Sequence, residues 1–142
     1  AIKKLGVDIS GKDGKLMING SNGKLSGNTE IDVNESGTLL RFVTGLASLA
    51  RGTVNITGSK RIQERPISNL LKSLGDLGVK YKSLNNGDPP VEIISGILKG
   101  GLTKIDGSIS SQFISSLLLI SPFAENDVEI EKRGLSTIIH IV

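Results

Sequence analysis

Three short polar segments of this chain carry the residue types that bind anions. They are "NESGTLLR" at 34–41, "RIQERPI" at 61–67 and "SISSQF" at 108–113. Each places serine, glycine, proline or arginine where a helix is expected to begin. The first turn of a helix offers N–H groups without partners and the positive end of the helix dipole, so it attracts anions. We therefore treat the three segments as candidate anion-binding sites.

The segment at 34–41 combines a helix start with an arginine one turn later. Asn34 or Ser36 is suited to cap the helix, because a short polar side chain accepts a hydrogen bond from a free N–H group. Gly37 has no side chain and leaves room for an anion to approach the backbone, and Arg41 adds a full positive charge. The same residues also fit an ordinary capped helix with a surface arginine, and on their own they leave both interpretations open.

The segment at 108–113 offers hydroxyl groups and an amide at a second helix start. Ser108, Ser110 and Ser111 supply hydroxyls near the free N–H groups, and Gln112 supplies a carbonyl and an amino group. This set suits a phosphate together with a polyhydroxyl ring. A serine-rich N-cap without a ligand is the alternative.

The segment at 61–67 places an arginine directly before a proline. Proline is favoured at the first position of a helix, and the residue before it is held in an extended conformation. We therefore expect a third helix from Pro66, with Arg65 at its mouth. Glu64 is placed to orient Arg65, and Arg61 is a further basic group one turn earlier. A solvated charge cluster is the alternative.

Hydrophobic periodicity and glycine-rich turns place these segments between strands and helices. We predict strands at 7–10, 15–19, 30–33, 53–57, 79–83, 91–95, 102–105, 127–131 and 137–142, and helices at 1–5, 36–50, 66–77 and 110–121. This order predicts an α/β fold of the α+β type, in which repeated βαβαββ units form mixed sheets with inward-packed helices.

The chain also resembles itself at an offset of about 74 residues. The stretch "EIDVNESGTLL" at 30–40 aligns with "KIDGSISSQFI" at 104–114, and "LGVDI" at 5–9 returns as "LGVKY" at 77–81. Such a period is typical of duplicated supersecondary units. We predict a single domain over 1–142, in which one complete unit is flanked by the end of one unit and the start of another.

Both ends of the chain look cut, and we expect a fragment of something larger. The flanking αββ and βαβ segments add up to one unit, so residues 1–19 and 102–131 should pack together. If they do not, an apolar face should be exposed and the fragment should self-associate.

Composition excludes several classes of function. The chain has no cysteine and one histidine, His140, which excludes disulfides, thiolate metal sites and histidine-rich metal sites. The net charge of +3 is scattered, and three phenylalanines, one tyrosine and no tryptophan offer few stacking platforms for bases. No apolar run approaches the roughly 20 residues of a membrane span. We expect small anionic ligands, no nucleic acid, no membrane, no metal and a cytoplasmic location.

In their order and spacing, the polar segments resemble the EPSP synthase (3-phosphoshikimate 1-carboxyvinyltransferase) family. The matching stretches include "NESGTLLRF", "GSKRIQERPISNLLKSLGDLGV", "PPVEI" and "IDGSISSQFISSLLLISPFA", and they cover nearly the whole chain. The resemblance implies two domains, each with three βαβαββ units, of which this chain is most of one. It implies a transferase of the shikimate pathway of aromatic amino acid biosynthesis. That enzyme moves the enolpyruvyl group of phosphoenolpyruvate to shikimate 3-phosphate without a cofactor.

The resemblance also assigns roles to the candidate residues. The contacts to shikimate 3-phosphate are matched by Ser110, Ser111, Gln112 and Ser136. The contacts to phosphoenolpyruvate are matched by Gly37 and Arg65, with Arg41 and Arg61 as supporting basic residues. The family's acid–base residues belong to the second domain, so we expect no catalytic residue in this chain and no activity from it alone.

The match weakens near the C-terminal end. The family's Lys-Pro after Ser136 is Thr137-Ile138 here, and its tyrosine falls at Ile139. Two alternatives remain for the function. One is a catalytically silent anion-binding or assembly module, and the other is a domain like that of UDP-N-acetylglucosamine enolpyruvyl transferase.

Overall fold

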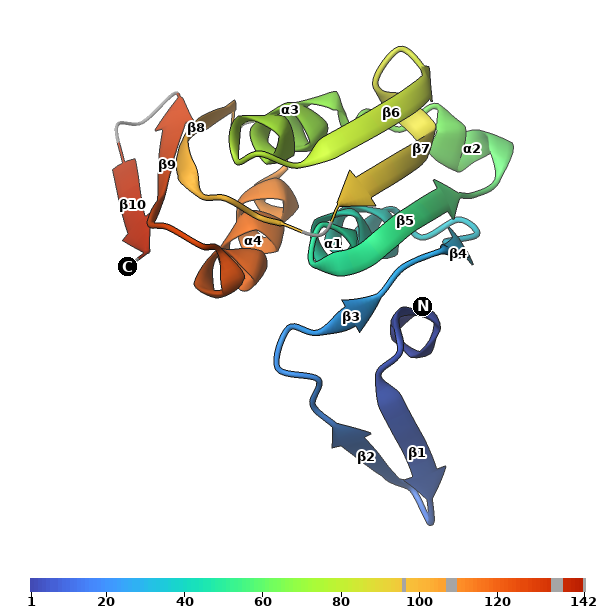
Figure 1. Ribbon diagram of the computed structural model, residues 1–142. Helices are drawn as coiled ribbons and strands as arrows, with labels where there is room; N and C mark the ends of the chain where they lie inside the picture. The colour runs from blue at the N-terminus through green and yellow to red at the C-terminus, as the bar shows by residue number, and fades with distance from the viewer. Residues whose placement is uncertain (96, 107–109, 134–136, 142) are drawn as a thin grey trace.

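A parallel strand–helix–strand unit occurs twice in the computed structural model, which describes residues 1–95, 97–106, 110–133 and 137–141. The first unit consists of β4 (Thr29–Asp32), α1 (Gly37–Ala47) and β5 (Ala50–Thr57). The second consists of β8 (Gly101–Asp106), α4 (Ser111–Ile120) and β9 (Val128–Arg133). Figure 1 shows the two units side by side, with α1 and α4 in contact.

The strands of the described residues form three separate sheets. In the five-stranded sheet, β5 is flanked on one side by β3 (Leu25–Ser26) and β4, both parallel to it, and on the other by antiparallel β7 (Asp88–Ser95). The edge strand β6 (Lys80–Asn85) pairs with β7. The three-stranded sheet has the order β10 (Thr137–Ile141), β9, β8. The third sheet is the hairpin of β1 (Asp8–Lys12) and β2 (Lys15–Asn19).

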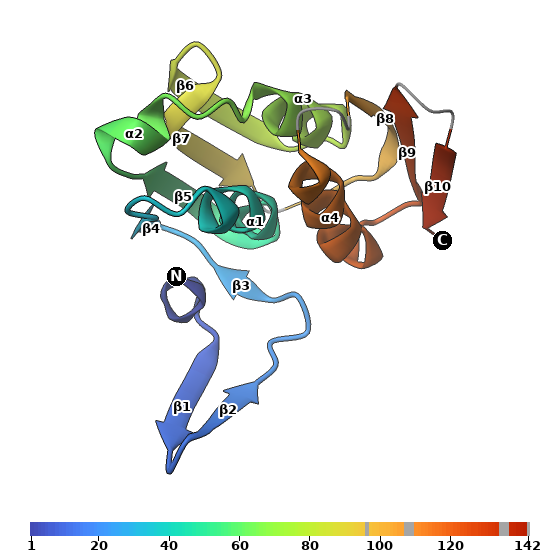
Figure 2. The ribbon, with the colours of Figure 1, turned by 180° about the vertical axis from the view of Figure 1, so that it is seen from behind.

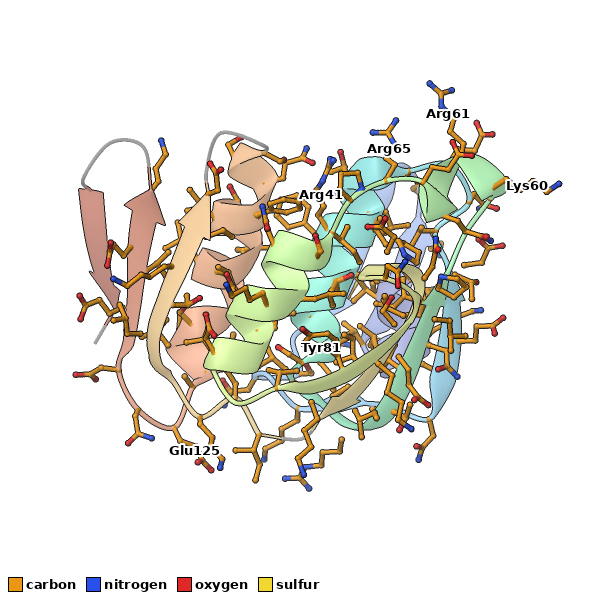
Figure 3. The ribbon with its side chains drawn as sticks, turned by 90° about the horizontal axis from the view of Figure 1, so that it is seen from above. Arg41, Lys60, Arg61, Arg65, Tyr81 and Glu125 are labelled. Carbon is orange, nitrogen blue, oxygen red and sulfur yellow. The ribbon has the colours of Figure 1, made fainter. Side chains whose placement is uncertain are left out.

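The helices lie inside and the sheets outside. Figure 3 shows α1, α4 and α3 (Ser68–Asp76) in a central layer, with one sheet on either side. Each helix buries an apolar stripe, whose side chains recur at the spacing that places them on one face of a helix. The buried side chains are Leu40, Val43 and Ala47 of α1, Leu70, Leu71 and Leu74 of α3, and Phe113, Leu117 and Ile120 of α4. The predicted fold class, with mixed sheets and inward-packed helices, is confirmed.

Two predicted helix boundaries were wrong by two residues or more. The helix predicted at 36–50 ends at Ala47, because Ala50 already pairs with Leu25 in the sheet. The helix predicted at 66–77 begins at Ser68 rather than at Pro66. Ile67 precedes the helix, and its N–H donates to the Asp88 carboxylate at 3.4 Å.

The described residues also contain three short helical segments. They are η1 (Ile2–Leu5), α2 (Lys60–Gln63) and η2 (Ser121–Phe123). Among the described helices, none is long and apolar enough to cross a membrane.

The expected packing of the two chain ends was wrong. Within the described residues, β1 and β2 pair only with each other, while β8 and β9 belong to the three-stranded sheet. Figures 1 and 2 show the hairpin and that sheet at opposite ends of the molecule. The cause is β3, which joins β5 directly after the hairpin and leaves the hairpin beyond the end of the sheet. Leu16, Met17 and Ile18 are accordingly 67%, 65% and 58% exposed. Self-association stays a prediction.

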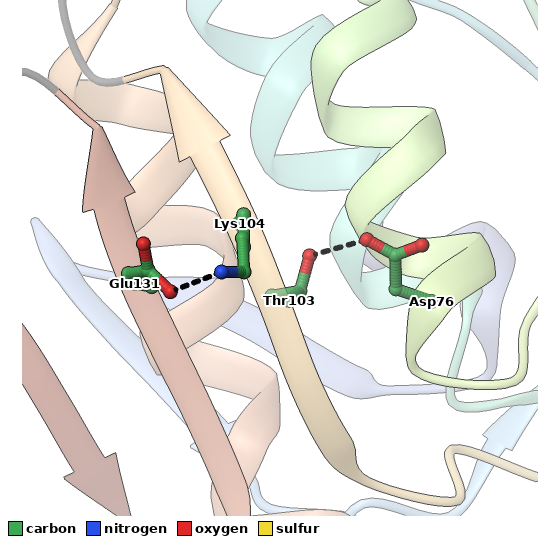
Figure 4. Close-up of polar contacts among 4 residues, drawn as sticks. All are labelled: Asp76, Thr103, Lys104 and Glu131. Carbon is green, nitrogen blue, oxygen red and sulfur yellow. Dashed lines mark hydrogen bonds and ion pairs between the residues drawn. The ribbon is translucent and has the colours of Figure 1, made fainter.

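A side-chain hydrogen bond links α3 to the second unit. The buried Thr103 hydroxyl on β8 donates to the Asp76 carboxylate on α3 at 2.9 Å (Figure 4). The next residue, Lys104, points to the other face of the strand and forms an ion pair with Glu131 of β9 at 2.7 Å. The Thr103–Asp76 bond connects α3 to the three-stranded sheet. The Lys104–Glu131 ion pair connects β8 and β9, which are already paired in that sheet.

We expect Thr103→Val to lower the free energy of unfolding by about 1 kcal/mol, because it removes a hydrogen bond of which one partner is buried. Lys104→Gln is the matched control on the same strand, and it should cost at most about 0.5 kcal/mol, since exposed ion pairs contribute little. Urea unfolding followed by circular dichroism measures both. Equal stability of Thr103→Val and the parent chain would contradict the role given to this bond.

Candidate anion-binding site

Two helices of this fold begin with a capping serine. Ser36 caps α1, and its hydroxyl accepts a hydrogen bond from the Leu39 N–H at 3.1 Å. Ser110 caps α4, and its hydroxyl accepts from the Gln112 N–H at 3.3 Å. The choice left open by the sequence between Asn34 and Ser36 is thus settled for Ser36. Each cap serves one of the free N–H groups of its helix and leaves others for a ligand.

A hydrogen-bonded bridge joins the first turns of α1 and α4. Arg41 Nη1 donates to Gln112 Oε1 at 2.6 Å, and Gln112 Nε2 donates to Thr38 Oγ1 at 3.1 Å. The Arg41 guanidinium also lies 5.6 Å from the centre of the Phe113 ring, within the range of a cation–π contact. These contacts fix the Gln112 amide and the Arg41 guanidinium at the shared edge of the two helices.

Arg65 reaches the same edge from a different part of the chain. Its N–H donates to the Ile62 carbonyl at 3.0 Å, which ends α2 and turns the chain toward α3. Its side chain lies against the start of α1, where Gly37 is buried. A Cβ atom added at Gly37 would be 2.9 Å from Arg65 Nη1, so the absence of a side chain there gives the guanidinium its place.

The charges at this edge are unbalanced. Among the residues that the structure describes, no acidic side chain pairs with Arg41 or Arg65, and the ion pairs are Lys82–Glu92 and Lys104–Glu131. Burial, and then the charge of Arg65, lower the pKa of Arg41 below its ordinary value. Arginine still remains charged at neutral pH. Arg41 Nε is buried without a hydrogen-bond partner. Two converging guanidinium groups without an acid favour a bound anion.

Most of the residues predicted from the sequence meet at this edge. Gly37, Arg41, Arg65, Ser110 and Gln112 do so through the contacts given above, and Ser111 is the exposed first residue of α4. Ser108 and Ser136 lie outside the described residues.

Arg61 and Glu64 are placed differently. Arg61 is exposed on α2 and projects outward (Figure 3). Glu64 is exposed, and in the described part of the chain it forms no ion pair with Arg65. The orientation of Arg65 therefore comes from the backbone turn and from Gly37.

Thr38 and Phe113 were missed by sequence reasoning. Both flank residues that the polar pattern identified. Thr38 and Gln112 are 74 residues apart, which equals the offset of the aligned stretches, so the alignment contained a signal for this pair. Phe113 belongs to the apolar stripe of its helix, and no sequence pattern indicates that its ring also contacts Arg41.

A hollow of about 450 Å³ lies elsewhere, between α3 and β8. It is lined by Asn69, Lys72, Asp76, Leu102, Lys104 and Asp106. Asp76 and Lys104 are engaged by Thr103 and Glu131 (Figure 4), so these groups serve the packing of the fold. No group of three potential metal ligands occurs within the described ranges.

The model of the EPSP synthase (3-phosphoshikimate 1-carboxyvinyltransferase) family matches residues 1–142. The chain belongs to the EPSP synthase family. A 3-phosphoshikimate 1-carboxyvinyltransferase of Methanospirillum hungatei is 44% identical over 136 residues, which are 94% of this chain and 31% of the relative. One from Methanobrevibacter smithii is 46% identical over 131 residues, covering 90% and 30%.

Solved structures of the EPSP synthase family share the fold. The EPSP synthase of Acinetobacter baumannii superposes with a TM-score of 0.80 at 27% identity, covering 95% of this chain and 32% of that one. The chain spans about a third of the length of the curated relatives that it matches. The resemblance drawn from the polar segments is confirmed at the level of the family.

We expect Gly37→Ala to weaken the binding of inorganic phosphate to this chain about tenfold, because the new Cβ displaces the Arg65 guanidinium and a charge-assisted hydrogen bond is lost. The fold should be kept, since the displaced group is the end of a flexible side chain. Gly20→Ala is the control, because a Cβ there meets nothing within 4 Å. Amide shift titration by NMR measures the affinities, and equal affinity in Gly37→Ala would disprove this placement of Arg65.

Proposed function

We propose that this chain is part of one domain of a two-domain EPSP synthase and carries half of its substrate site. The complete enzyme transfers the enolpyruvyl group of phosphoenolpyruvate to shikimate 3-phosphate, which gives 5-enolpyruvylshikimate 3-phosphate and phosphate. The observation that carries this proposal is the convergence of Arg41 and Arg65 at the start of α1 without an acidic partner in the described residues. Family membership supplies the identity of the anions.

Shikimate 3-phosphate is assigned to the start of α4. Ser110 and Ser111 bring hydroxyls to a helix N-terminus, which favours a phosphate group. Gln112 accepts from Arg41 and donates to Thr38, and its second amino hydrogen is left for a ring hydroxyl of the substrate. Ser136 is assigned to the same phosphate by the family resemblance alone.

Phosphoenolpyruvate is assigned to Arg65 and the start of α1. Gly37 keeps the helix start open and leaves space for the Arg65 side chain. Arg41 lies between the two assigned positions, so its charge offsets the repulsion between two anions held side by side. Arg61 is exposed, and it contributes at most a long-range electrostatic attraction for the anionic substrates.

This chain contributes binding and orientation to the reaction. In the family reaction, a substrate hydroxyl attacks the enol carbon while the methylene carbon is protonated, and the tetrahedral intermediate then loses phosphate. Arginines, hydroxyls and helix N-termini stabilise the negative charge of the two substrates and hold them in reacting distance. The proton-transfer groups belong to the second domain, so we propose that the isolated chain is inactive. A cytoplasmic location remains part of the proposal.

We expect the isolated chain to bind shikimate 3-phosphate saturably and to bind shikimate, which lacks the phosphate, far more weakly. Ser111→Ala should reduce the affinity for shikimate 3-phosphate about tenfold, the usual effect of losing a hydrogen bond to a charged group. Ser115→Ala on the same helix is the control, because its hydroxyl bonds to the Ser111 carbonyl at 3.2 Å. Isothermal titration calorimetry measures these affinities. Equal binding of both ligands would overturn the assignment of the phosphate to α4.

We expect no release of phosphate when the isolated chain is mixed with phosphoenolpyruvate and shikimate 3-phosphate, because half of the cleft is missing. A coupled phosphate assay measures this, and turnover by the chain alone would disprove the half-site. The complete protein should be active in the same assay. An inactive complete protein that still binds shikimate 3-phosphate would instead support the silent anion-binding module.

A further inference from the structure

A second hydrogen bond between Arg41 and α4 lies one turn below the arginine–glutamine bridge. The Ser116 hydroxyl on α4 donates to the Arg41 carbonyl on α1 at 2.9 Å, and Ser116 is buried. Gly45 of α1 faces the same hydroxyl, and a Cβ atom added at Gly45 would collide with Ser116 Oγ. The two helices therefore approach as closely as a glycine allows.

The hydrogen bond donated by Ser116 differs from those donated by Thr44, Ser115 and Ser121. Thr44 bonds to the Leu40 carbonyl and Ser121 to the Leu117 carbonyl, each four residues earlier and each at 2.7 Å. Ser115, next to Ser116, bonds to Ser111 in the same way. This back-bonding within one helix is the common behaviour of serine and threonine. Ser116 instead reaches a carbonyl of the neighbouring helix.

Both hydrogen bonds between Arg41 and α4 come from one face of that helix. Gln112 and Ser116 are four residues apart and so lie one above the other. Gln112 holds the Arg41 guanidinium, and Ser116 holds the Arg41 backbone. Gln112 also donates to Thr38 of α1, and apolar side chains of both helices, such as Leu40 and Phe113, belong to one buried cluster. Apolar contact is non-directional, whereas a hydrogen bond fixes distance and angle.

We propose that Ser116 is a positioning residue for Arg41. Its hydroxyl holds the Arg41 backbone against α4 at the spacing that Gly45 permits, and this spacing brings the guanidinium to the Gln112 amide. Arg41 is thereby aimed at the anion before the anion binds. The inference rests on the proposed function, since it assigns a task to Ser116 within that binding site.

The first test uses Ser116→Ala in the isolated chain. The side-chain amide resonances of Gln112, assigned through their loss in Gln112→Glu, should shift in Ser116→Ala without any ligand. The affinity for shikimate 3-phosphate should fall about fivefold, which corresponds to one hydrogen bond. Ser115→Ala is the control for a hydroxyl lost next to Ser116, and Ser73→Ala is the control for a buried hydroxyl, because Ser73 Oγ has no partner. Neither control should change the Gln112 resonances or the affinity.

The second test uses Gly45→Ala, which places a methyl group where the Ser116 hydroxyl lies. It should separate the helices and reduce the affinity further than Ser116→Ala does. In the double variant with Ser116→Ala, the colliding hydroxyl is gone, and the nearest atoms to the new Cβ would be the backbone oxygen of residue 116 at 3.3 Å and its Cβ at 3.5 Å. The double variant should therefore return to the affinity of Ser116→Ala alone. It also provides a folded comparison if either single variant fails to fold.

The outcomes separate this inference from the proposed function. If the parent chain does not bind shikimate 3-phosphate, the proposed function fails, and the Gln112 resonances still test the role of Ser116. If the parent chain binds and Ser116→Ala changes neither the Gln112 resonances nor the affinity, the positioning role is wrong. Additive losses in the double variant would also overturn it, because the two residues would then act independently.

Discussion

The contact between α1 and α4 is the interaction on which the proposed anion-binding edge depends. Each helix follows a strand of its own parallel unit, and the two units meet through these helices. Their apolar stripes are buried, which supplies the main favourable free energy of the contact. Only with the helices in contact do Arg41 and Gln112 meet, since they are 71 residues apart in the chain. The polar edge is thus a consequence of how the apolar faces pack.

The same packing imposes an electrostatic cost on the free protein. Arg41 is partly buried and lies near a second guanidinium, and both effects disfavour its charge. The part of the chain that the structure describes contains no acid to offset this at Arg41 or Arg65. Unpaired charges of this kind lower the stability of the folded protein, and such charges in a well-packed fold are expected at functional sites. Under the proposed function, a bound anion would remove the imbalance and would link ligand binding to local stability.

The sequence predicted the elements better than their contacts. The apolar period of α1 follows from local rules, so Leu40 and Val43 were identified correctly as buried positions, and the cap Ser36 was one of two candidates. The bridge from Arg41 through Gln112 to Thr38 depends on the angle and depth at which two helices pack, and no local pattern carries that information. The packing of residues 1–19 with 102–131 was inferred from a count of elements. It was wrong because the pairing of β3 with β5 fixes the hairpin elsewhere.

The most direct test of the half-site is to locate shikimate 3-phosphate on this chain by NMR chemical-shift mapping. The half-site predicts that the perturbed amides cluster at Ser110–Gln112 and at the neighbouring Arg41, with saturable behaviour. Perturbations confined to the hollow between α3 and β8, or spread over the exposed lysines without saturation, would contradict it.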